Sequence, residues 1–204
     1  RLSTLSNQFS NNVLDATQAW HKDIQDRDAL AGVPESALET LKALADAKGV
    51  DGYRITLDFP SFFPVMTYCD NRDLRREVYE AFVTRASDQG PDAGTWDNTP
   101  LMAEILKRRH SLSKLLGFNN YAERSLATKM ARDVEEVIGF LDDLARRAKP
   151  QAEREVAALK AYAAEQGADD LQPWDLGYWS ERLREARYDL SDEALRPWFP
   201  AEKV

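Results

Sequence analysis

Apolar side chains recur every three or four residues along most of this chain, a spacing that places them on one face of a helix. The first such stretch runs from Leu5 to Ile24, and the clearest runs from Val134 to Ala163 behind the cap candidate Asp133. Pro150 interrupts that second stretch and predicts a kink or a new helix, because proline lacks an N–H donor. The chain is therefore predicted to be mainly α.

Proline, glycine and short polar residues predict where the other helices begin and end. Pro34 and Gly49 bound one helix, Asp70 or Asn71 begins the next, and Thr99 and Gly117 bound a third. Further helices are predicted at 121–129, at 175–187 and from residue 191 onward.

The period changes between Tyr53 and Phe59, where apolar and polar residues alternate as in a half-buried strand. A second short apolar run, Val65 to Cys69, follows a loop bounded by two prolines. We therefore predict one small two-stranded β-hairpin near 53–69. Two strands are marginally stable alone, so this hairpin must pack against the helices.

Composition restricts the partners and the compartment. The chain carries 27 Lys and Arg against 35 Asp and Glu, a net charge of −8, which disfavours nucleic acid and anionic membrane surfaces. It has no run of the roughly 18 apolar residues that a membrane-spanning helix needs. Cys69 is the only cysteine, which favours a reducing compartment and a cytoplasmic location. We expect this thiol to be buried at the end of the apolar strand.

The length of 204 residues fits one large domain or a piece of a larger protein. Residues 1–10 show no signal-peptide pattern, and the chain opens on Arg1. We therefore expect that it begins inside a longer polypeptide or was processed.

The two histidines, His21 and His110, are the first candidates for metal binding or acid–base chemistry. A zinc site of the H-E-x-x-H type needs a second ligand close by on the same helix, and no such residue flanks His110. Both histidines are therefore predicted to be structural, at the border between core and solvent.

Other charged and aromatic groups have equally ordinary interpretations. Two acidic pairs, 135–136 and 142–143, flank an apolar stripe and predict a solvated helix face. Three basic clusters, 75–76, 107–109 and 146–147, predict surface ion pairs, with a smaller chance that one faces an acidic substrate. Trp174, Tyr178 and Trp179 predict a core or interface cluster, with a peptide groove as the alternative.

The ordered text of nearly the whole chain resembles the thimet oligopeptidase and oligopeptidase A family of zinc metallopeptidases, and its bacterial members most closely. The stretches that carry the likeness, in order, are YRITLDFP (53–60), PVMTYC (64–69), RASDQGP (85–91), WDN (96–98), LLGFNNYA (115–122), SLATKMA (125–131), FLDDL (140–144), KP (149–150), QPWD (172–175), ARY (186–188) and LRPWFP (195–200). Trp179 and Trp198 stand where tyrosine is expected in many relatives.

This resemblance implies a neurolysin-like, multi-helix enzyme with two domains beside a deep channel that admits short unfolded peptides. It also implies zinc held by the two histidines of H-E-x-x-H and a later glutamate, with the motif glutamate as the base that activates a zinc-bound water. No H-E-x-x-H occurs in residues 1–204. We therefore assign no catalytic, cofactor-binding or metal-ligating residue in this chain, and expect zinc only in a full-length parent.

Two hypotheses follow from the resemblance. In the first, the chain is one compact internal fragment of the parent: 1–52 is a helical hairpin from its N-terminal part, 53–69 the β-hairpin, and 70–204 a helical wall of the peptidase domain. Such a fragment would be inactive, and it would self-associate through the surface that the missing domain covers. In the second, the chain is a stand-alone helical scaffold that binds peptides or a protein without turnover.

Overall fold

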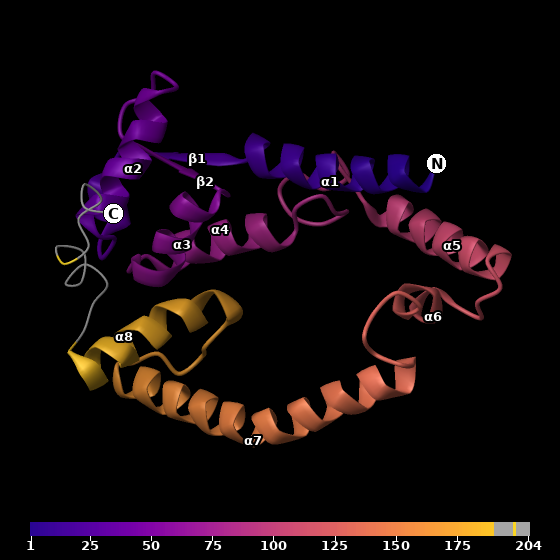
Figure 1. The fold of residues 1–204 in the computed structure, drawn as a ribbon. Helices are drawn as coiled ribbons and strands as arrows, with labels where there is room; N and C mark the ends of the chain where they lie inside the picture. Colours follow the sequence, from indigo (N-terminus) through magenta and orange to yellow (C-terminus); the bar gives the residue numbers. More distant parts are fainter. Residues whose placement is uncertain (190–197, 199–204) are drawn as a thin grey trace. The chain divides into compact units, whose positions relative to one another are not determined.

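The computed structural model describes residues 1–189 and 198, and these residues are mainly helical (Figure 1). The elements, in chain order, are α1 (Leu2–Ala19), β1 (His21–Ile24), η1 (Arg27–Leu30), α2 (Glu35–Asp46), β2 (Tyr53–Thr56), α3 (Phe59–Tyr68), α4 (Arg72–Val83), α5 (Thr99–Leu115), α6 (Tyr121–Leu126), α7 (Val134–Glu165), η2 (Pro173–Asp175) and α8 (Leu176–Tyr188). The predicted fold class is confirmed. The short helix expected from Ser191 falls outside the described residues.

The single sheet of the described residues has two antiparallel strands, β1 and β2, as the fold class predicted, but one strand differs from the expected one. β2 pairs with residues 21–24, with Ile24 opposite Tyr53, and residues 65–68 belong to helix α3. Two pairs, Trp20 with Ile24 and Val65 with Cys69, are each four residues apart, a spacing that fits both a helix and a strand. Pairing across the chain therefore decided which stretch became the strand.

Local signals set most helix ends as predicted. The Asn71 side chain accepts a hydrogen bond from the Leu74 amide at 3.1 Å, and Asp133 accepts one from the Glu136 amide at 2.8 Å. Gly49 and Gly117 each follow the end of a helix, and both glycines have a positive φ. The predicted cap Thr99 is instead the first residue of α5, and Asn98 occupies the cap position.

Helix α7 runs without a break through Pro150, so the predicted alternative of a new helix at this position is wrong. A proline inside a helix removes one backbone hydrogen bond, and the turns on either side keep theirs.

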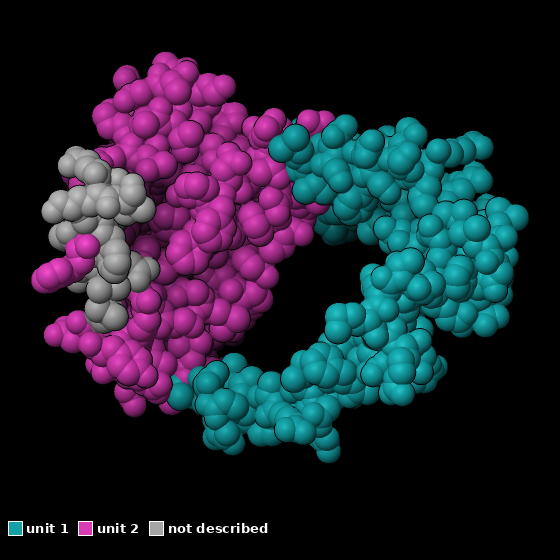
Figure 2. Space-filling view, viewed as in Figure 1, with its two compact units in different colours: residues 1–14, 86–158 teal, residues 15–85, 159–204 magenta. Residues whose placement is uncertain are grey.

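The described chain divides into two compact units (Figure 2). Residues 15–85 and 159–204 form unit 2, whose core is built from β1, β2 and helices α2 to α4, with Leu30, Leu41, Ile55, Val65 and Val78 all at most 1% exposed. Residues 1–14 and 86–158 form unit 1. Among its described residues, the buried ones are only Ala86, Asn98, Ile105 and Ser113.

Candidate functional site

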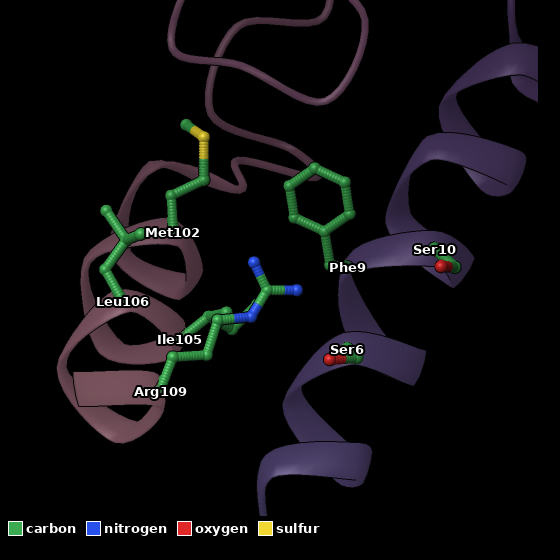
Figure 3. Close-up of a pocket in the computed structure, with 7 residues that line it drawn as sticks. All are labelled: Ser6, Phe9, Ser10, Met102, Ile105, Leu106 and Arg109. Carbon is green, nitrogen blue, oxygen red and sulfur yellow. The ribbon is translucent and has the colours of Figure 1, made fainter. Parts of the chain in front are cut away.

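A pocket of about 460 Å³ lies between α1 and α5 in unit 1 (Figure 3). Its walls come from two helix faces with regular spacing: Ser6, Phe9 and Ser10 on α1, and Met102, Ile105, Leu106 and Arg109 on α5. The Phe9 ring and the Arg109 guanidinium both point into the space between the helices (Figure 3). The volume falls within the range of small-molecule pockets.

Asn98 fixes the two helices that form this pocket. Its side chain is buried, donates to the Phe9 carbonyl at 3.1 Å and accepts from the Asn12 amide at 2.9 Å. Its backbone N–H donates to the Ala86 carbonyl at 3.0 Å. Asp97 accepts a hydrogen bond from the Thr99 amide, and bonds from Thr99 lower the pKa of Asp97. Both ends of the amide group of Asn98 are therefore used to hold α1 against the start of α5.

Arg109 supplies the charge of the pocket. Its guanidinium lies 4.8 Å from the centre of the Tyr121 ring, and no carboxylate in the described part of the chain forms an ion pair with it. Met102 and Leu106 remain 46% and 65% exposed, so apolar surface is available beside this cation. The arrangement suits a ligand that carries both an apolar group and an anion.

A buried ionic cluster occupies unit 2. The Asp175 carboxylate is 1% exposed and accepts from Arg75 at 2.8 Å and from Arg72 at 2.7 Å. Arg75, which is 2% exposed, also donates to the Cys69 carbonyl at 2.6 Å. The prediction that Arg75 forms a surface ion pair is therefore wrong, because this residue lies on the inward face of α4, near Leu74 and Val78.

Burial and hydrogen bonds together shift the pKa of two groups in this region, Asp175 and Tyr178. Burial raises the pKa of Asp175, but hydrogen bonds from Arg72 and Arg75 outweigh that effect and hold the pKa below its ordinary value. Burial raises the pKa of Tyr178, and so does the 2.8 Å bond that its hydroxyl donates to Asp70. Asp175 binds two arginines and the Gln172 amide, so the cluster connects α4 to the start of α8 and has a structural role.

The prediction that both histidines lie at the border between core and solvent is wrong. His21 and His110 are both exposed to solvent. Nowhere in residues 1–189 or at 198 do three or more His, Cys, Asp or Glu side chains gather as a metal site would require.

Cys69 is fully buried, as predicted, although it caps a helix and does not end a strand. Its Sγ lies 3.5 Å from the Ala29 carbonyl oxygen, and burial raises the pKa of this thiol. A thiol in this environment is a poor nucleophile.

The remaining charged and aromatic groups follow their predictions more closely. Glu135, Glu136 and Asp142 are exposed, and Arg147 pairs with Asp143 at 2.7 Å on the surface. Trp174 packs against the core of unit 2, and the Trp179 ring meets Tyr162 edge-on at 6.2 Å. The aromatic cluster is thus part of the packing. Sequence reasoning missed the roles of Asn98 and Arg109, since neither shows its distant partners through local spacing.

Comparison with known proteins identifies the family. Residues 65–204, more than half of the chain, match the family model described as Peptidase family M3. The chain belongs to peptidase family M3. This result confirms the resemblance found in the sequence.

Several M3 relatives match over the full length of the chain. Oligopeptidase A of Salmonella typhimurium is 60% identical over 205 residues, and that of Haemophilus influenzae is 56% identical. A probable cytosolic oligopeptidase A of Arabidopsis thaliana is 45% identical over 213 residues. Each alignment covers all of this chain and 30% of the relative, so the chain spans about 30% of the length of these proteins.

Proposed function

We propose that this chain is an internal part of a zinc-dependent oligopeptidase that hydrolyses internal bonds of short, unstructured peptides, including cleaved signal peptides. The observation that carries the proposal is the 60% identity to a protein named oligopeptidase A, together with the M3 family match. We place the activity in the cytoplasm because the chain has a single buried cysteine. No helix of the described residues is long and apolar enough to cross a membrane.

The zinc of the proposed parent would be bound outside residues 1–204. Two observations support this: no group of three or more His, Cys, Asp or Glu side chains comes together among the described residues, and residues 1–204 contain no H-E-x-x-H. The chain's own contribution would be a wall that helps to admit short peptides and to exclude folded proteins. Self-association of the isolated chain, through the surface that the rest of the parent covers, belongs to the same proposal.

Peptidase assays on two proteins test this function. The present chain should not cleave an internally quenched peptide, whereas the same chain extended to the length of its relatives should cleave it and lose activity to a zinc chelator. His110→Ala in the extended protein serves as a control and should leave zinc content and kcat/KM nearly unchanged, because His110 is exposed. An extended protein that is inactive with zinc bound would contradict the proposal, and a large loss of zinc in the His110 variant would contradict our interpretation of that residue.

The alternative function is a scaffold that binds peptides without turnover, and the pocket beside Arg109 favours it. A peptide that ends in an apolar residue offers an apolar group and a carboxylate together, which matches the lining of this pocket. In this alternative the present chain is functional without an added catalytic domain.

Replacing Arg109 tests that alternative. In the present chain, Arg109→Gln should weaken binding of a short peptide with a free C-terminal carboxylate by about tenfold, because a charge-assisted hydrogen bond is lost. Isothermal titration calorimetry measures this change. The same peptide with an amidated C-terminus should bind wild type and variant equally, and equal loss for both peptides would count against a carboxylate site.

A further inference from the structure

The N-terminal half of α7 carries an apolar stripe that lies open to solvent. Val137, Leu141 and Leu144 follow each other at steps of four and three residues, so they share one helix face. Leu141 is 51% exposed and Leu144 48%, and the neighbouring Phe140 is 63% exposed. Scattered exposed apolar residues are ordinary, but a contiguous set on one helix face marks a contact surface.

The opposite face of the same helix is solvated in the usual way. Asp143 pairs there with Arg146 and Arg147, and Glu136 accepts from the Arg132 amide at 2.7 Å. The helix is thus amphipathic over residues 134–148, and its polar face already has partners. The apolar face, by contrast, is half-buried at Val134 and Val137 and exposed at Leu141 and Leu144.

Further along the helix, the same stripe is buried. Leu159 is 7% exposed and Ala163 is fully buried, and both continue the spacing that begins at Val137. Between them, Tyr162 meets α8: its ring lies edge-on to Trp179, and its hydroxyl donates to the Arg182 carbonyl at 3.3 Å. One continuous stripe is therefore covered at Leu159 and Ala163 in unit 2, half-buried at Val134 and Val137, and exposed from Leu141 to Val156.

Unit 1 has little else to cover this face. Its described residues bury only Ala86, Asn98, Ile105 and Ser113, which come from α5 and the loop before it. The relatives, in contrast, are more than three times as long as this chain, since it spans 30% of them. The polypeptide that the relatives have in addition is ample to supply a covering element.

We infer that the apolar face of α7 over residues 134–148 packs against an amphipathic helix from the remaining polypeptide of the full-length M3 protein. The occupant is an apolar helix face, because the stripe continues a surface that is already packed inside the protein at Leu159 and Ala163. This inference rests on the proposed function, in that it requires the chain to be part of a longer M3 protein. Peptide substrate is then not the ligand of this face.

Cysteine labelling tests the inference, because Cys69 is the only native cysteine and is fully buried. Leu141→Cys places a reactive thiol in the centre of the stripe, and Asp142→Cys places one on the exposed polar face, as a matched control. Both variants are made in the present chain and in the chain extended to the length of its relatives, with any cysteine of the added part replaced by serine. The probe is a water-soluble maleimide, followed by mass spectrometry at the lowest workable protein concentration.

The expected result is that Leu141→Cys labels at least about tenfold more slowly in the extended protein than in the present chain, while Asp142→Cys labels equally in both. Leu144→Cys repeats the test if the first variant does not fold. Equal labelling of the stripe in both proteins would overturn the inference. Protection that appears in the extended protein only at high concentration would also overturn it, since the occupant would then be a second copy.

Peptidase activity, measured on the same extended samples, separates the two proposals. An extended protein that cleaves peptides while the stripe labels freely contradicts only the inference. One that protects the stripe but has no zinc-dependent activity contradicts only the proposed function.

Discussion

Asp175→Ala is expected to lower the free energy of unfolding of unit 2 by about 3 to 5 kcal/mol, because it leaves the buried Arg75 guanidinium without its carboxylate. Arg75 and Asp175 are 2% and 1% exposed and lie 2.8 Å apart. Water cannot replace the lost partner without opening the contact between α4 and η2. Urea unfolding followed by tryptophan fluorescence measures the change, since Trp174 packs against the same core.

A matched control is available on the same helix, two residues before Arg75. Asp73 pairs with Arg76 at 3.3 Å, and its side chain is 85% exposed. Asp73→Ala should lower the free energy of unfolding by no more than about 1 kcal/mol, because water solvates both charges of the exposed pair and the only other loss is the interaction of Asp73 with the N-terminus of α4. Equal effects of the two substitutions would show that the buried cluster contributes no more than a surface ion pair.

The contribution of Asp175 also has a defined pH dependence. The pKa of this carboxyl is lower in the folded protein than in the unfolded chain, so the folded state holds the proton less tightly. Its stabilising effect is therefore complete above the ordinary aspartate pKa of about 3.9, and it declines as the pH falls through the lower, folded value. The difference in stability between wild type and Asp175→Ala should shrink over that acidic range.

Gly32→Ala is expected to destabilise the protein by at least about 3 kcal/mol, through backbone strain and a steric clash together. Gly32 has a φ of +86°, and a Cβ atom at this position would lie 2.3 Å from the Tyr68 carbonyl oxygen. The neighbouring backbone cannot easily move away, because the Asp70 amide donates to the Ala31 carbonyl at 2.8 Å. Thermal and urea unfolding both report the loss.

Gly167 separates the two causes. Its φ is also +86°, but an added Cβ would meet nothing within 4 Å. Gly167→Ala should therefore cost only the strain of the left-handed conformation, about 1 to 2 kcal/mol. If the two alanine variants were equally stable, the close approach of Gly32 to Tyr68 would have no energetic weight.

Features that depend on neighbouring residues were predictable from the sequence. The helix ends at Asn71, Gly117 and Asp133 were predicted correctly, because a cap or a positive φ involves residues only a few positions apart. The mainly helical class was also predictable, since the three-to-four-residue spacing persists through most of the chain. The family followed from the order of many short stretches, none of which is a catalytic signature alone.

Features that depend on distant partners were decided only by the tertiary structure. Spacings of four residues at Trp20–Ile24 and at Val65–Cys69 suit either a helix or a strand, and long-range pairing chose β1 over the predicted strand at 65–69. The pocket likewise needs Asn98 to reach Asn12, 86 positions away.

The burial of the charged residue Arg75 could not be predicted from the sequence either. Its neighbour Arg76 has the same side chain and is exposed, and only the direction of α4 relative to Asp175, 100 positions later, buries one and leaves the other in water. A sequence pattern gives the face of a helix on which a residue lies. Which faces become buried depends on the partners that folding brings together, and for α7 we infer that those partners include the remaining polypeptide of the full-length protein.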